Sequence, residues 1–452
     1  MTSGAVALLL LALQGGALGA LLAGRGRIDW RLVAAAALPL GLAVHHAVHL
    51  PLALIALAPS WVSVGSVTAG LVLAAWMARG RPLAADAPPA HRSPEAWTPV
   101  DVALAGLTGL LVVLAATVAA LEPIVEWDTV AIWAFKARLA ATGALVGGRV
   151  LADPALAYAH LDYPLLWPLA LAADPAFGGT NAIVAGRLLA PALLASGCAL
   201  LFVLLEPTVG RRAALAAAVL LASLPIATAE AIRGQADLPL AVVLLAAAGA
   251  LARGRLEEDR LATRIGAVAL VALPLVKSEG AALAAAVAIF ELARRRPPAR
   301  RALLGSLAAA AILLLGPWAA LRSTLPALHH HAQLGEIVAG WGHVLERLAP
   351  LALAIPRYLL APSDWGLFWP LVVLALAAAA LLGREGRRPL ARAAAPALAL
   401  PFYALVLLTH ALAIEELAEV TLSRLALGFA GVAALAAGDA LGVVIHAVRR
   451  SR

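Results

Sequence analysis

The residue types that could do chemistry gather between Glu122 and Trp167, in a segment that separates long apolar runs. Near its start stands Glu126-Trp127-Asp128, in which two carboxylates flank an indole ring. A carboxylate can accept a proton from a hydroxyl nucleophile when a site positions it beside that group. We therefore expect chemistry in this acidic and aromatic segment, just outside a membrane span.

Residues 129–141 can form a helix whose apolar side chains share one stripe, namely Val130, Trp133, Ala134 and Ala137. Such a helix is predicted to lie in the membrane interface with its apolar face down. Lys136 and Arg138 flank the stripe, where each would meet an anionic headgroup. The alternative is that the Trp and Lys side chains only anchor a span at the interface.

The proline-containing run 160–168 re-enters apolar sequence without helical periodicity. It offers an imidazole, a carboxylate and a phenol at His160, Asp162 and Tyr163. The run predicts a loop that lines a pocket with rings and one carboxylate. A loop that plugs the mouth of the helix bundle is the alternative interpretation.

Three ionisable residues, Glu230, Arg233 and Asp237, have the spacing i, i+3 and i+7. On a continuous helix they would share a face, and Arg233 could pair with Asp237. Ionisable side chains at this depth are costly and usually face a cavity or one another. Gly234 and Pro239 indicate a helix break here instead. A purely structural ion pair is the alternative to a binding role.

Only two of the 34 basic residues are lysines, Lys136 and Lys277, and both stand beside acidic residues. Lys277 is followed by Glu279 within a short polar interruption of an apolar run. A compact ammonium group suits a phosphate. The alternative is a salt bridge that closes a helical turn.

The composition is that of a membrane protein, because 63% of the 452 residues are hydrophobic and only 13% are charged. Only helices and closed barrels satisfy their backbone in lipid, and these apolar runs are continuous rather than alternating. We therefore predict an all-α polytopic helical membrane protein. The net charge of +8 lies in short loops that set orientation, so it does not indicate nucleic-acid binding.

The apolar runs predict about thirteen membrane segments, at residues 4–23, 32–52, 61–78, 100–121, 182–205, 212–230, 237–252, 265–276, 281–293, 302–320, 367–383, 390–411 and 424–447. Placing the arginine clusters inside puts the N-terminus outside. Basic clusters flank the run 265–293 at both ends, so we predict two short helices that meet at an outer turn, Lys277 to Gly280.

Three larger outer segments follow from this topology, at residues 122–181, 321–366 and 412–423. The last and its border carry a small charged group, which we interpret as a solvated loop edge, with a substrate contact as the alternative: Glu415, Glu416, Glu419 and Arg424.

Four short motifs resemble the GT-C superfamily of membrane glycosyltransferases, which includes protein mannosyltransferases and the aminoarabinose transferases of lipid A. They are WDTVAIWAFKAR, DYPLLWP, QADLPLA and LVKSEG, and they lie between about residues 100 and 300. The resemblance implies a GT-C-like catalytic membrane core at 99–320, with interfacial helices in outer loop 122–181. An N-terminal three-span extension occupies 1–98, and an outer loop with three C-terminal spans occupies 321–452.

The resemblance implies an inverting transfer of sugar from a polyprenyl-phosphate carrier, on the outer face of a bacterial plasma membrane. The loop carboxylate that deprotonates the acceptor hydroxyl would be Asp128, with Glu126 as its rival. A cation would stabilise the lipid-phosphate leaving group. Candidate substrate-binding residues are Lys136, Arg138, His160, Asp162, Tyr163, Arg233, Asp237, Lys277 and Glu279.

Among these, Lys136, Arg233 and Lys277 are the candidates for the phosphate, while Asp162 and Tyr163 would hold sugar or acceptor. The acceptor could be a lipid, a glycan or a protein. The sequence identifies no cofactor, and it leaves open a divalent metal near Glu126 and Asp128, which do not form a complete ligand set.

Two other function classes remain open at this point. A transporter or flippase of a lipid-linked or anionic substrate would need polar residues near the bilayer midplane. A non-catalytic scaffold, or a ligase that needs no carboxylate base, would keep full activity without Asp128.

Overall fold

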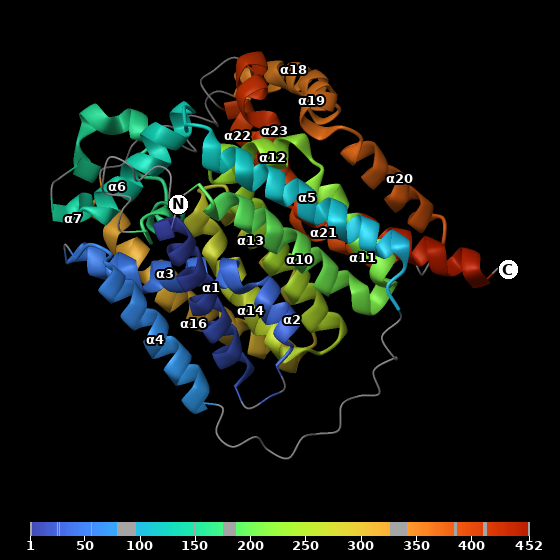
Figure 1. The fold of residues 1–452 in the computed structure, drawn as a ribbon. Helices are drawn as coiled ribbons and strands as arrows, with labels where there is room; N and C mark the ends of the chain where they lie inside the picture. Colours follow the sequence, from blue (N-terminus) through green and yellow to red (C-terminus); the bar gives the residue numbers. More distant parts are fainter. Residues whose placement is uncertain are drawn as a thin grey trace.

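The computed structural model describes residues 2–24, 26, 28–55, 57–78, 96–147, 150–174, 187–325, 341–383, 387–409 and 414–450. These residues form helices and connecting turns, and no strand occurs among them (Figure 1). Nine of the described helices are long and apolar enough to cross a membrane, or up to ten if one bent pair is a single span. This is the architecture of a polytopic helical membrane protein.

Long apolar helices occur where the apolar runs predict them: α1 (Thr2–Ala23), α3 (Ala37–Leu54), α4 (Trp61–Ala78), α5 (Pro99–Leu121), α10 (Leu189–Val209), α13 (Asp237–Leu256), α16 (Pro297–Arg322) and α23 (Ile414–Arg450). The bent pair is α11 (Arg211–Ala222) and α12 (Pro225–Arg233), and the apolar stretch Pro389–Leu408 spans most of α21 (Arg387–Ala397) and α22 (Leu400–Thr409).

The remaining predicted segments are helices too short to count as spans by length, so thirteen crossings stay a prediction. They are α14 (Arg260–Val276), α15 (Gly280–Arg294) and α20 (Phe368–Ala380). The two short helices predicted within 265–293 are present, and Lys277 to Glu279 separate them. Gly280 allows the turn, since a Cβ there would lie 2.0 Å from the carbonyl oxygen of Leu273.

The shorter helices connect or cover the long ones. They are α2 (Trp30–Ala35), η1 (Thr129–Ala134), α6 (Phe135–Ala141), α7 (Ala144–Gly147), η2 (Val150–Ala152), η3 (Pro154–Ala159), α8 (Leu166–Leu171), α18 (Trp341–Leu359) and α19 (Pro362–Trp365). Residues 79–95, residues 182–186 of the fifth predicted segment, and parts of each outer segment lie outside the described residues.

Helix α13 lies at the centre of the bundle. From Leu238 to Ala252 all of its side chains are buried, and α10, α14 and α23 pack around it. A helix that is apolar on every face must be surrounded by other helices or by lipid. Here protein surrounds it, so charged residues at its two ends are held at fixed depths.

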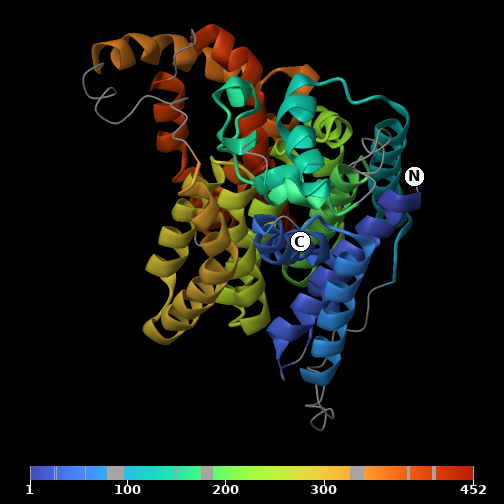
Figure 2. The same cartoon turned by 90° about the vertical axis from the view of Figure 1, so that its left-hand side faces the viewer.

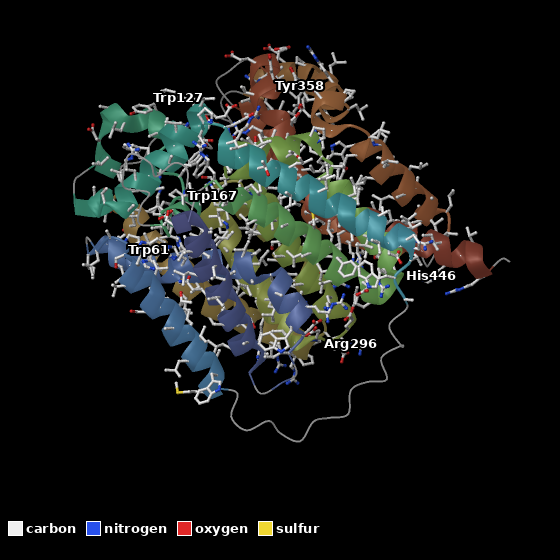
Figure 3. All side chains as sticks on the ribbon, in the orientation of Figure 1. Trp61, Trp127, Trp167, Arg296, Tyr358 and His446 are labelled. Atoms are coloured by element: carbon white, nitrogen blue, oxygen red, sulfur yellow. The ribbon has the colours of Figure 1, made fainter. Side chains whose placement is uncertain are left out.

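Residues predicted to be outside gather at one end of the molecule. Figure 2 shows the segment from η1 to α8 at the same end as α18. Trp127 and Tyr358 lie at that end, whereas Arg296 of the predicted inner arginine cluster lies at the other (Figure 3). The two labelled aromatic residues from predicted outer segments and the labelled arginine from the predicted inner cluster therefore lie at opposite ends, as the topology requires.

The crossing of α1 and α3 gives a test of this packing. A Cβ at Gly15 would lie 1.7 Å from the carbonyl oxygen of Ala37, whereas one at Gly16 would have no neighbour within 4 Å. We expect Gly15→Ala to destabilise by about 1–3 kcal/mol or more through overpacking. Gly16→Ala, the matched control, should be neutral or slightly stabilising, because alanine favours helix. Thermal melting in detergent measures both, and equal melting temperatures would contradict the close crossing.

Candidate functional site

A buried carboxylate at the start of α13 organises the polar end of the bundle. The side chain of Asp237 is 2% exposed. Its Oδ1 accepts a hydrogen bond from Lys277 Nζ at 2.8 Å, and its Oδ2 accepts from Arg424 Nη2 at 2.9 Å and Nε at 3.2 Å. Two cations from distant parts of the chain therefore neutralise one desolvated carboxylate.

Arg424 connects this carboxylate to the outer loop. Its Nη1 donates to Asp128 Oδ2 at 2.7 Å, and the Asp128 side chain is 32% exposed. On the other side, Lys277 Nζ lies 3.1 Å from Glu279 Oε1. We call these five residues, Asp128, Asp237, Lys277, Glu279 and Arg424, the Asp237 network.

The predicted pairing of Arg233 with Asp237 is wrong. Gly234 adopts a left-handed conformation with φ of 73° and ends α12, so Arg233 and Asp237 do not share a helical face. Arg233 instead lies 3.1 Å from Glu126 and 3.5 Å from Glu230. Arg233 thus links Glu126 of the outer loop to the buried Glu230.

The break between α12 and α13 also positions the outer loop. The hydroxyl of Thr129 donates to the carbonyl oxygen of Arg233 at 3.0 Å, and Trp167 Nε1 donates to that of Gly234 at 3.0 Å. These carbonyl groups are free to accept because the helix ends there. Asp128, one residue before Thr129, is thereby held over the end of α13.

Lys136 does not reach the surface, although its neighbour Arg138 does. None of the Lys136 side chain is exposed, and its Nζ donates to the carbonyl oxygen of His160. The ammonium lies 5.6 Å from the Trp133 ring and 5.3 Å from the Tyr163 ring. Residues 129–134 form a π-helix, whose wider turn shifts the register expected from α-helical spacing. In this conformation Lys136 supports the loop rather than meeting a headgroup.

The run 160–168 packs into the bundle. Leu165, Leu166 and Trp167 are fully buried, as the plug interpretation expects. His160 has a φ of 46° and stacks on Tyr163, with ring centroids 4.6 Å apart. Burial and the nearby charge of Glu279 raise the pKa of Tyr163 to about 12, so its hydroxyl keeps its proton at neutral pH.

Arg424 is the site residue that the sequence interpretation placed wrongly. It is not on a solvated loop edge but within α23, and its side chain is 22% exposed. An arginine that begins an apolar run is costly in a membrane unless it has partners. That cost indicates from the sequence that Arg424 has a partner, but it does not identify the partner. Both partners are more than 180 residues away along the chain.

Several buried oxygens near the network have no hydrogen-bond partner among the described residues: Asp162 Oδ1, Glu230 Oε2, Gln235 Oε1, Glu279 Oε2 and Tyr403 Oη. Tyr163 interacts electrostatically with Asp162, Glu279 and Asp237, and Tyr403 with the last two, which places these groups together. Unpartnered buried oxygens are rare in native proteins and mark candidate ligand contacts.

The arrangement contains cations and proton acceptors but no recognisable metal centre. No group of three or more His, Cys, Asp or Glu side chains in the described part of the chain is arranged to hold a metal ion. Comparison with protein-family models, curated protein sequences and solved structures gives no match. The functional interpretation therefore depends on the chemistry of the site.

Removing Arg424 should cost far more stability than removing Arg301. Arg424→Met leaves the buried Asp237 with one cation, and breaking a buried pair typically costs about 3–5 kcal/mol. Arg301→Met is the control, because this arginine is exposed and such surface substitutions usually change stability by about 0.5 kcal/mol or less. Thermal melting in detergent compares the two. Similar losses would contradict the central role of Asp237, and adding Asp237→Asn should partly rescue Arg424→Met.

The stability contributed by Lys136 should depend on pH. Burial lowers the pKa of Lys136 to about 7, and the charge of Asp162 offsets this only in part. Between pH 7 and about 10.4, the usual lysine value, the unfolded chain binds more protons, so stability rises with pH.

We therefore expect the melting temperature of the wild type, relative to Lys136→Met, to increase from pH 7 to pH 9.5. Arg138→Met is the control, because this neighbouring arginine is exposed and stays charged throughout. A wild-type advantage that does not change over this range would show that Lys136 titrates normally.

Proposed function

We propose that this multi-pass membrane protein is an inverting glycosyltransferase, which moves a sugar from a polyprenyl-phosphate carrier to an acceptor hydroxyl. The observation that carries the proposal is the group of unpartnered buried oxygens beside the Asp237 network. Four of the five are carboxylate or amide oxygens, which accept hydrogen bonds without donating when the acids are ionised. A sugar is rich in hydroxyl donors and therefore suits this set of acceptor oxygens.

The network also contains the groups that the reaction needs. The acceptor hydroxyl loses its proton to Asp128 while its oxygen attacks the anomeric carbon. The bond from that carbon to the phosphate oxygen breaks, and the phosphate leaves with the electron pair. Arg424 and Lys277 are the cations nearest to Asp128 and Asp237, and they would stabilise the leaving phosphate.

The ion pair between Arg424 and Asp128 links substrate binding to proton transfer. While Arg424 holds Asp128, Oδ2 of the carboxylate accepts a hydrogen bond from the guanidinium and is not free to accept a proton. A phosphate that takes over the guanidinium would remove this effect. Asp128 would then be free to accept a proton only after the donor has bound.

An exposed apolar rim borders the acidic loop, as a lipid-linked donor requires. Large apolar side chains that are at least 40% exposed here are Leu121, Val125, Trp127, Val130 and Tyr158. Leu121 ends α5, and the other four lie in the outer loop that carries Glu126 and Asp128. A polyprenyl chain could lie against these side chains while its phosphate reaches the network.

The charge balance adds one condition. Around Asp237, five carboxylates, Glu126, Asp128, Glu230, Asp237 and Glu279, face three cations. A phosphate adds negative charge, so its binding requires protonation of a carboxylate or an added cation. Assays of the proposed activity should therefore be run both with Mg²⁺ and with a chelator.

A transporter of a lipid-linked or anionic substrate is the second candidate, because ion pairs also lie at the opposite end of α13 and α23. Arg255 pairs with Glu291 there, and Arg392 pairs with Asp439. Ion pairs at the two ends of the bundle could act as the two gates of a transport path. Against this, α13 between them is apolar and buried, with no ionisable side chain from Leu238 to Ala252. This favours the enzyme, since a transporter needs polar groups near the midplane.

Asp128→Asn should abolish transfer while leaving the fold intact. With radiolabelled polyprenyl-phosphate sugars and protein in nanodiscs, we expect a loss of roughly 10²–10⁴-fold in rate, the usual contribution of a general base. Glu126→Gln tests the rival base, and Asp153→Asn is the control at an exposed aspartate outside the network.

Wild-type turnover that survives Asp128→Asn but not Glu126→Gln would move the base to Glu126. The label could instead cross the bilayer without release from the carrier, in the wild type and in both variants. That result would overturn the transferase proposal and support the transporter.

A further inference from the structure

A pocket lies at the end of the bundle opposite the Asp237 network. It is a small, partly open hollow of about 10 Å³ between α13, α15, α21 and α23. Asp237 and Arg255, at the two ends of α13, are separated by about 27 Å of helix. The pocket is therefore distinct from the candidate transferase site. Small alanine side chains form much of its wall, and three charged residues line it: Arg255, Glu291 and Arg392.

The charges of this pocket favour an anion. Glu291 accepts from Arg255 Nε at 3.1 and 3.3 Å, and Arg295 Nη2 lies 3.3 Å from the same carboxylate. Arg392 lies 3.1 Å from Asp439. Three guanidinium groups thus face two carboxylates, which leaves one net positive charge in a largely buried setting.

Arg255 has N–H donors that form no hydrogen bond with the described residues. Both of its hydrogen bonds use Nε, and none from the described residues reaches Nη1 or Nη2. Its side chain is 16% exposed and lines the pocket. The planar guanidinium can present its N–H groups in pairs, a geometry that matches two oxygens of a phosphate.

The surroundings of the pocket match a lipid rather than a free ion. Ile289 is 64% exposed next to Phe290, Leu390 is 39% exposed next to Ala391, and Leu256 is 43% exposed next to Arg255. Each exposed side chain therefore adjoins a residue that lines the pocket. Because Arg255 and Glu291 lie in the last turns of α13 and α15, the pocket is at headgroup depth if these helices span the bilayer.

We propose that this pocket binds the phosphate of an anionic phospholipid from the leaflet at the Arg296 end, with Arg255 as its principal ligand. The acyl chains lie against the exposed side chains of Ile289 and Leu390. Glu291 is the internal competitor, because it holds Arg255 when no lipid is bound. The site is independent of the proposed transferase activity.

The test uses the full chain in detergent and counts bound phosphatidylglycerol by native mass spectrometry. Wild type should retain phosphatidylglycerol in preference to phosphatidylcholine, whose headgroup has no net charge. Arg255→Gln should weaken retention by roughly tenfold, the equivalent of one charged hydrogen bond. Glu291→Gln should strengthen it, because the competing carboxylate is gone. Arg301→Gln, at an exposed arginine of the same end, is the control.

Opposite effects of Arg255→Gln and Glu291→Gln separate a lipid site from a structural ion pair. Were Glu291→Gln to weaken retention as much as Arg255→Gln, or neither to change it, the proposal would be overturned. Inorganic phosphate that displaces phosphatidylglycerol at equal concentration would overturn the choice of a lipid. Melting temperatures of both variants identify any that fails to fold, and Arg255→Lys then replaces Arg255→Gln with the same expected direction, since lysine lacks the paired donors.

Discussion

The buried carboxylate of Asp237 is the constraint on which the polar end of this protein depends. A carboxylate removed from water is strongly disfavoured unless cations and hydrogen-bond donors surround it. Lys277 and Arg424 supply both, from positions 40 and 187 residues further along the chain. The first turn of α13 must therefore contact two distant parts of the chain. These are the break between α14 and α15 and the start of the apolar run of α23.

The outer loop depends on the same point. Arg424 uses one guanidinium for Asp237 and for Asp128, so the loop carboxylate is fixed relative to the core. The end of α12 provides a second attachment, because the carbonyl groups of Arg233 and Gly234 accept hydrogen bonds from Thr129 and Trp167. A candidate base is thus placed by two independent contacts with the helix bundle, rather than by the loop's own conformation.

Sequence reasoning located the helices well because long apolar runs in a membrane have one stable conformation. It also located both breaks, at Gly234 and at Lys277, since glycine and charge interrupt such runs visibly. The ion-pair partners of the charged residues were harder to predict from the sequence. Pairing of Arg233 with Asp237 required a continuous helix, and the indicated break at Gly234 turns Arg233 toward Glu126 instead. Arg424 was assigned to a solvated loop edge, at the start of the last predicted segment, because its partners lie far away in sequence.

Lys136 shows a subtler limit. Helical spacing put it beside an apolar stripe, free to meet a headgroup, but a π-helical turn before it changes the register and buries it between two rings. Such a turn has no reliable sequence signal, because it depends on what packs against it.

The spacing of charges along α13 is the strongest structural argument about function. Both ends of this helix lie in ion-pair networks, and everything between them is apolar and buried. A substrate that crossed the bundle would have to pass this stretch without a polar partner, at the full cost of desolvation. Chemistry confined to one end avoids that cost, because polar groups then stay at headgroup depth. The spacing of charges along α13 therefore favours the proposal of two separate binding sites over that of two gates of one path.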